Sequence, residues 1–235
     1  MNIGLSLKKY FHSQDELLDM RDKEKRDINT LSTYFTQIHS LADKLRNNYD
    51  INLSKYPEFR VLRVLRNYMH HVDDVEEFRM YAVLQPQVSI YNMEHLIVPI
   101  SYWAQCLKNL IDTNSHPNKQ KFLKKELSGI QEISDCSDIL EHLDAFCSPV
   151  FLKCDGKVVE LGFDIYKFVY NMSNIIVHEF QNNNDLCQEL SLVEIDDSYS
   201  IDNNIPKYDL SCHAGTNCIL TLNGYIFPTK VERAI

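Results

Sequence analysis

The residues whose types could act together lie in one short segment, Arg66-Asn67-Tyr68-Met69-His70-His71. Arginine carries a permanent charge and a planar fork that suits phosphate oxygens. Histidine titrates near neutral pH and can transfer protons. Asn67 and His71 are four residues apart and would share one face of a helix, where the amide could orient the imidazole or a phosphate oxygen. Arg66 would lie about 140° around an ideal helix from His71, and its length would let it bend back toward a shared cavity.

These three side-chain types meet the requirements for cleaving RNA without a metal. A base removes the proton from a 2′-hydroxyl, and that oxygen attacks the adjacent phosphate. A cation then stabilises the crowded phosphorane. The segment predicts such a site with Arg66, Asn67 and His71 as the catalytic residues, and with no cofactor.

The segment from Leu65 to His71 resembles the signature of the HEPN superfamily, which is Arg, four to six residues, then His, commonly with Asn, Asp or His directly after Arg. It is similar to abortive-infection and toxin members with Leu-Arg-Asn-Tyr before the His. The resemblance implies a small helical bundle over roughly the first half of the chain and a metal-independent endoribonuclease. It also implies a homodimer whose two motifs line one cleft, and products with 2′,3′-cyclic phosphate and 5′-hydroxyl ends. The partners would be RNA, a second copy of the chain, and an antitoxin or another protein of a defence system.

Other assignments fit the same residues. Arg63 and His70 satisfy the looser signature, but Val64 follows Arg63 where a polar residue is expected. Arg63, His70 and Tyr68 are therefore supporting or alternative residues. The bundle could instead be an inactive module that binds nucleotides, RNA or protein. A structural helical protein, with Arg66 in a salt bridge and His71 at a helix end, is the third interpretation.

Metal chemistry has weaker support. Cys212-His213 with Cys218 lacks an obvious fourth ligand for a structural zinc site. His178-Glu179 lacks the second His of the metalloprotease motif. The acidic run of Asp73, Asp74, Glu76 and Glu77 could bind a divalent cation, but adjacent carboxylates usually form a solvated face. We therefore expect no metal site.

Composition sets limits on the function. The 235 residues are 44% hydrophobic and 11% aromatic, which is enough for a real core. With 24 Lys and Arg against 33 Asp and Glu, the net charge is −9, which excludes a general polyanion binder and requires any RNA site to be a local positive patch. Seven Cys without framework spacing predict reduced thiols. Because we find neither a leader-like start nor a long apolar stretch, we expect a cytoplasmic protein without a membrane segment.

The sequence predicts a mainly α fold with short β-hairpins, since six Gly and seven Pro are few for an all-β chain of this length. Apolar periodicity predicts helices over residues 5–26, 28–45, 57–71, 94–112, 119–127, 138–147 and 163–180. Pro99 marks a possible kink or start of the helix over residues 94–112. Hairpins are expected over residues 78–91, 150–161 and 218–227. The predicted organisation is a HEPN-like helical domain over residues 1–181 with inserted hairpins, followed by a mixed, partly β extension over residues 182–235.

Overall fold

The computed structural model describes residues 3–19, 29–81, 88–90, 94–191, 193, 198–207, 210–212 and 219–233. The chain forms two compact units, each built from two stretches of sequence. The first unit comprises residues 1–66 and 167–205, and the second comprises residues 67–166 and 206–235. One division between them falls inside a single helix, between Arg66 and Asn67.

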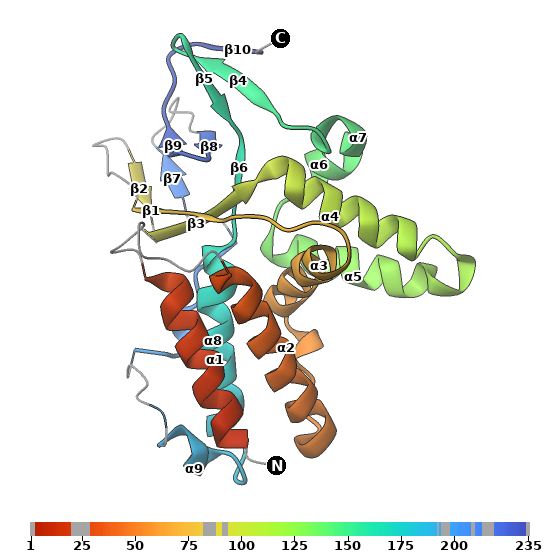
Figure 1. Ribbon diagram of the computed structural model, residues 1–235, viewed down its shortest axis with the longest axis vertical. Helices are drawn as coiled ribbons and strands as arrows, with labels where there is room; N and C mark the ends of the chain where they lie inside the picture. The colour runs from red at the N-terminus through yellow and green to blue at the C-terminus, as the bar shows by residue number, and fades with distance from the viewer. Residues whose placement is uncertain are drawn as a thin grey trace. The chain divides into compact units, whose positions relative to one another are not determined.

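The first unit is helical. Its elements are α1 (Ile3–Leu18), α2 (Thr30–Tyr49), η1 (Leu53–Lys55), most of α3 (Pro57–His71), nearly all of α8 (Tyr166–Gln181), α9 (Cys187–Leu190) and η3 (Ile201–Asn203). Figure 1 shows α1 and α2 as neighbouring helices in red and orange.

Apolar spacing explains why α2 forms a helix with one buried face. The buried apolar residues recur three or four positions apart, as a helix requires: Leu31, Tyr34, Phe35, Ile38, Leu41, Ala42 and Leu45. The helix ends at Asp50, whose φ of 55° is left-handed and whose backbone N–H donates to the carbonyl of Leu45. The opposite face of α2 is left to polar residues.

Helix α8 contributes both buried apolar residues and polar contacts to the first unit. Phe168, Met172 and Phe180 are fully buried. Tyr10 of α1 hydrogen-bonds Ser173 at 2.8 Å. The fully buried Asn171 donates to the carboxylate of Glu58 on α3 at 3.2 Å and to the carbonyl of Ile205 at 3.0 Å. Its side-chain oxygen accepts from the Ile205 N–H at 2.8 Å. The amide therefore joins three separate segments of this unit with its hydrogen bonds satisfied.

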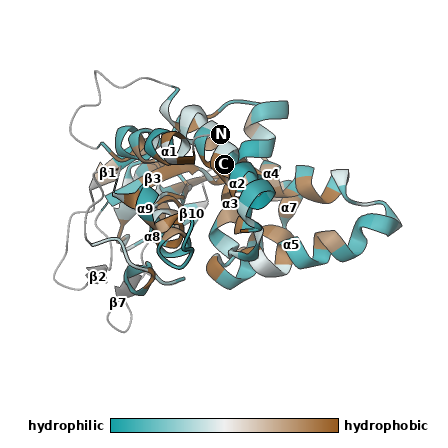
Figure 2. Cartoon of the chain, turned by 90° about the horizontal axis from the view of Figure 1, so that it is seen from below, coloured by the Kyte–Doolittle hydropathy of each residue, from teal (hydrophilic) through white to brown (hydrophobic). Residues whose placement is uncertain are grey.

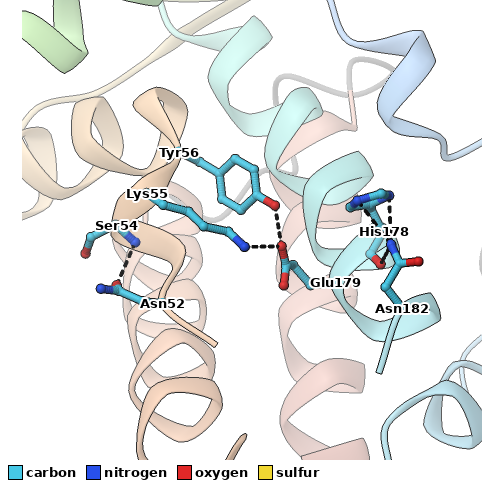
Figure 3. A network of polar contacts seen from close by, with 7 residues as sticks. All are labelled: Asn52, Ser54, Lys55, Tyr56, His178, Glu179 and Asn182. Carbon is cyan, nitrogen blue, oxygen red and sulfur yellow. Dashed lines mark hydrogen bonds and ion pairs between the residues drawn. The ribbon is translucent and has the colours of Figure 1, made fainter. Parts of the chain in front are cut away.

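A second polar network joins the start of α3 to α8. Lys55 Nζ lies 2.8 Å from Glu179, and the hydroxyl of Tyr56 donates to the same carboxylate oxygen, as Figure 3 shows. The neighbouring His178 is turned toward Asn182 (Figure 3). Glu179 is therefore an ion-pair residue that fixes the entry to α3.

The second unit mixes helices with small antiparallel sheets. Its helices are the end of α3, α4 (Ile100–Thr113), η2 (Pro117–Lys119), α5 (Gln120–Ile133), α6 (Ser137–Glu141) and α7 (Leu143–Phe146). Its strands are β1 (Phe78–Tyr81), β2 (Val88–Ile90), β3 (Glu94–Pro99), β4 (Phe151–Cys154), β5 (Lys157–Glu160), β6 (Gly162–Asp164), β7 (Leu210–Cys212), β8 (Ile219–Thr221), β9 (Gly224–Ile226) and β10 (Val231–Arg233). The strand orders are β1-β3-β6, β10-β4-β5, β2-β7 and β8-β9.

The core of the second unit lies where α4 packs on β3 and β6. Leu96, Ile97 and Val98 of β3 are fully buried. The indole of Trp103 stacks on Phe163 with ring centroids 4.7 Å apart. On α5 the buried residues recur at helical spacing, and hydrophobic and hydrophilic segments alternate along its ribbon in Figure 2.

The prediction of a mainly helical chain with small antiparallel sheets is confirmed. The described residues contain the helices expected around α2, α3, α5 and α8, and hairpins at β4–β5 and β8–β9. The helix expected over residues 5–26 is α1, and residues 20–28 lie outside the described part. The predicted domain boundary after residue 181 stays a prediction.

Two sequence expectations in the second unit are wrong. The hairpin over residues 78–91 does not form, because β1 pairs with β3 and β2 pairs with β7; its turn at residues 85–87 lies outside the described residues. The helix expected from about Glu94 begins at Ile100, directly after Pro99, which the sequence indicates as a possible kink or start. The residues before it form the strand β3, whose centre is buried. β3 pairs with β1 on one side and with β6 on the other.

Over the described ranges, none of the helices combines the length and the apolar character that crossing a membrane would need.

Candidate functional site

Arg66 lines a polar pocket in the first unit. The pocket has a volume of about 460 Å³, and α2 contributes all of its lining residues except Arg66: Thr36, His39, Ser40, Asp43, Lys44, Asn47 and Asn48. These positions recur three or four residues apart, so they form the polar stripe opposite the apolar face of α2. The pocket therefore combines two cations, a carboxylate, an imidazole, hydroxyls and amides.

His39 is the least expected member of this pocket. Its ring packs against Phe59 of α3 with centroids 5.2 Å apart. Its Nε2 atom is buried and has no hydrogen-bond partner among the described residues. Burial, followed by the positive charges of Arg66 and Arg63, lowers the pKa of His39 to about 4. At pH 7 the imidazole is therefore neutral, and a bound group could supply its missing hydrogen bond.

The charged residues among the described lining of the pocket are two cations, Lys44 and Arg66, and one carboxylate, Asp43. Asp43, the carboxylate among the described lining residues, is paired with Arg46 at 3.0 Å. Lys44 donates to the hydroxyl of Ser6 and retains further N–H donors. Arg63 donates to the Ser54 hydroxyl at 2.8 Å. A local positive patch of this kind is what an acidic protein needs to bind an anion.

The rest of the sequence motif lies at the exposed end of α3. The helix runs unbroken through the motif and ends at His71, where the Val72 N–H still donates to the carbonyl of Tyr68 at 2.8 Å. Asn67, His70 and His71 are all exposed. The two imidazoles touch each other, with their Nδ1 atoms 3.5 Å apart and their rings edge to face.

Tyr68 anchors this end of α3 to α4. Its ring is buried and meets Tyr102 edge to face at 5.2 Å, and its hydroxyl donates to Gln105 at 2.7 Å. Burial raises the pKa of Tyr68 above its ordinary value, so the phenol stays protonated at neutral pH. These contacts assign Tyr68 to positioning the helix end.

Within the described part of the chain, Arg66 is the motif residue that lines the pocket. Neither Asn67 nor His71 is among the residues that line the pocket. The alternative cation, Arg63, is held by Ser54 and lies over the ring of Phe59. Sequence reasoning missed His39 and Lys44, because the polar face of an amphipathic helix gives no signal that selects two of its residues.

The acidic run after the motif is dispersed. Asp73, Asp74 and Glu76 are exposed, whereas Glu77 is buried and forms an ion pair with the buried Arg79 at 2.8 Å. No group of three potential metal-ligating His, Cys, Asp or Glu residues occurs within the described ranges. The Cys212-His213-Cys218 candidate falls largely outside them, since residues 213–218 are not described.

No protein-family model matches the chain, and searches of curated proteins and of solved structures return no significant match.

Proposed function

We propose that the protein is a metal-independent endoribonuclease of the HEPN type that acts in the cytoplasm, as a toxin or in antiphage defence. Arg66 stabilises the charge that develops on the phosphate, His71 transfers the proton, and Asn67 orients the imidazole or a phosphate oxygen. The observation that carries this proposal is the end of α3, where Asn67 and His71 are exposed one helical turn apart.

The proposed active form is a homodimer. One motif supplies one proton-transferring His71, whereas cyclisation uses both a base and an acid. A two-fold axis would bring two copies of His71 into one cleft. Val72, which follows His71, is 56% exposed and offers an apolar contact for the second copy. An antitoxin or another defence protein is the further partner that this function implies.

The test is cleavage of a defined single-stranded RNA by the purified protein in EDTA, with analysis of the product ends. The proposal expects 2′,3′-cyclic phosphate and 5′-hydroxyl ends, and no cleavage by the His71→Ala variant. Products with 5′-phosphate ends, or equal cleavage by His71→Ala, would rule out this chemistry.

A second candidate is a HEPN-like module that binds RNA or a nucleotide without cleaving it. The specific observation in its favour is that Arg66 lines a pocket to which Asn67 and His71 do not contribute. This candidate predicts RNA binding that depends on Arg66, with no cleavage product at any protein concentration.

A further inference from the structure

We propose that the pocket on α2 and α3 is a binding site for a phosphate group of the RNA, with Lys44 and His39 as ligands alongside Arg66. The inference rests on the proposed function for the identity of the ligand as RNA. It adds two residues of α2 that the sequence motif does not contain.

The lining of the pocket suits a phosphate. Arg66 lines the pocket with a guanidinium, a group that suits phosphate oxygens, and Lys44 adds a compact charge on a flexible stem. Hydroxyls of Thr36 and Ser40 add neutral donors on the same face of α2. Because Arg46 pairs with Asp43, the carboxylate repels an incoming anion less than it would alone.

His39 gives a specific reason to expect a ligand. A buried nitrogen without a partner is costly, and native structures rarely leave one unsatisfied. A neutral imidazole can donate one hydrogen bond to a phosphate oxygen when Nε2 carries the proton. A phosphate in the pocket therefore supplies the hydrogen bond that the Nε2 atom of His39 lacks.

The experiment measures binding of a short fluorescein-labelled single-stranded RNA by anisotropy, in the His71→Ala background so that the RNA stays intact. Lys44→Met keeps the stem but removes the charge, and should weaken binding about tenfold, as loss of a charged hydrogen bond does. The slope of log K against log salt should fall by about 0.7. His39→Phe keeps a ring packed on Phe59 but removes the hydrogen-bond donor, and should also weaken binding. His39→Gln keeps a donor and should retain much of the parental binding.

Two controls separate the pocket from general effects. Lys8→Met removes an exposed charge from α1 of the same unit and should leave binding unchanged. Ser6→Ala removes the hydroxyl to which Lys44 donates, without changing any charge, and should also bind normally. RNA with and without a 5′-phosphate then distinguishes the source. If Lys44→Met weakens binding only of RNA that carries the 5′-phosphate, the site holds the terminal phosphate. If Lys44→Met weakens binding of both RNAs equally, the site holds a backbone phosphate.

The two proposals fail in different ways. Parental binding by both Lys44→Met and His39→Phe, or no RNA binding by the protein, would overturn the phosphate site. If the parent binds RNA through Lys44 but forms no product, the phosphate site stands and the ribonuclease proposal fails. Circular dichroism of each variant confirms that the fold is retained before binding is compared.

Discussion

The imidazole of His39 and the guanidinium of Arg66 line the same pocket from two different helices. Burial and then the charge of Arg66 lower the pKa of His39 to about 4. The two residues are therefore electrostatically coupled, although His39 lies outside the sequence motif that contains Arg66. Removing the charge of Arg66 should raise the pKa of His39, which a proton NMR titration of the imidazole would measure.

This coupling predicts how stability depends on pH. His39 has an ordinary pKa of 6.5 and a folded-state pKa of about 4, so the unfolded chain binds the proton more readily. The stability contributed by neutral His39 is complete above pH 6.5 and falls as the pH drops toward about 4. The loss should be about 2 kcal/mol after allowing for solvent screening of a half-buried ring. Urea unfolding of the parent and of His39→Phe between these pH values measures it, and equal pH profiles would contradict the prediction.

Arg66→Lys should be nearly as damaging to RNA cleavage as Arg66→Ala. Lysine keeps the positive charge but loses the planar fork that holds two phosphate oxygens. Initial cleavage rates of the two variants on one RNA, at matched helicity, provide the comparison. If the lysine variant cleaves at the parental rate, the bidentate role of Arg66 is wrong.

His71→Ala should abolish cleavage, and His70→Ala should keep much of it. Adjacent helical residues point about 100° apart, and His71, four residues after Asn67, is the one that the family spacing selects. Both rings are exposed, so neither substitution removes core packing. Cleavage assays after checking helicity and oligomeric state test this. The reverse pattern would move the site to Arg63 and His70, and full activity in both variants would end the ribonuclease proposal at this helix.

Cleavage should continue in EDTA at the parental rate. The proposed steps use only the side chains of His71, Arg66 and Asn67. The measurement is the initial rate with and without chelator, followed by addition of Mg²⁺ or Mn²⁺. Loss of activity in EDTA that a divalent ion restores would move the assignment toward the acidic residues after the motif.

The protein should be a dimer in solution, with Val72 in the interface. Val72→Glu places a charge at an exposed apolar position beside His71 and should shift the protein toward monomer while reducing cleavage. Val158→Glu is the matched control, because Val158 is 61% exposed on β5 and its substitution should leave the dimer intact. Analytical ultracentrifugation of the parent and both variants measures the oligomeric state. A monomeric parent that still cleaves RNA would remove the argument for two copies of His71.

Local signals in the sequence predicted the elements that depend on local physics. The periodicity of α2, α3 and α8 fixed these helices because one apolar face of each is buried. The turns at Asp155-Gly156 and at Gly224 have positive φ angles of 49°, 85° and 98°, which the Asp-Gly and Asn-Gly sequences favour. Each of these features is determined within a few residues of chain.

Long-range pairing could not be predicted in the same way. The run from Leu96 to Val98 is apolar and short, so it fits a buried strand or the start of a helix. Its identity as β3 depends on partners from β1 and β6, the latter about 65 residues away. The pocket is similar, because His39 becomes distinctive only when α3 brings Arg66 and Phe59 beside it. The candidate catalytic residues were identified from their types, their spacing and the family resemblance. The proposed ligands on α2, His39 and Lys44, could be identified only from the way the helices pack.

The two-stretch construction of the first unit has a consequence for its synthesis. About 100 residues separate the end of its first stretch at Arg66 from the start of its second at Lys167. At about 5–20 residues per second, a ribosome needs about 5–20 seconds to make that interval. During this time α1, α2 and α3 have emerged, but α8 is absent, so Glu58 lacks Asn171 and the apolar faces lack Phe168 and Phe180. The nascent helices therefore present a hydrophobic surface for longer than a contiguous bundle would, and chaperones that bind exposed apolar segments have that interval in which to act.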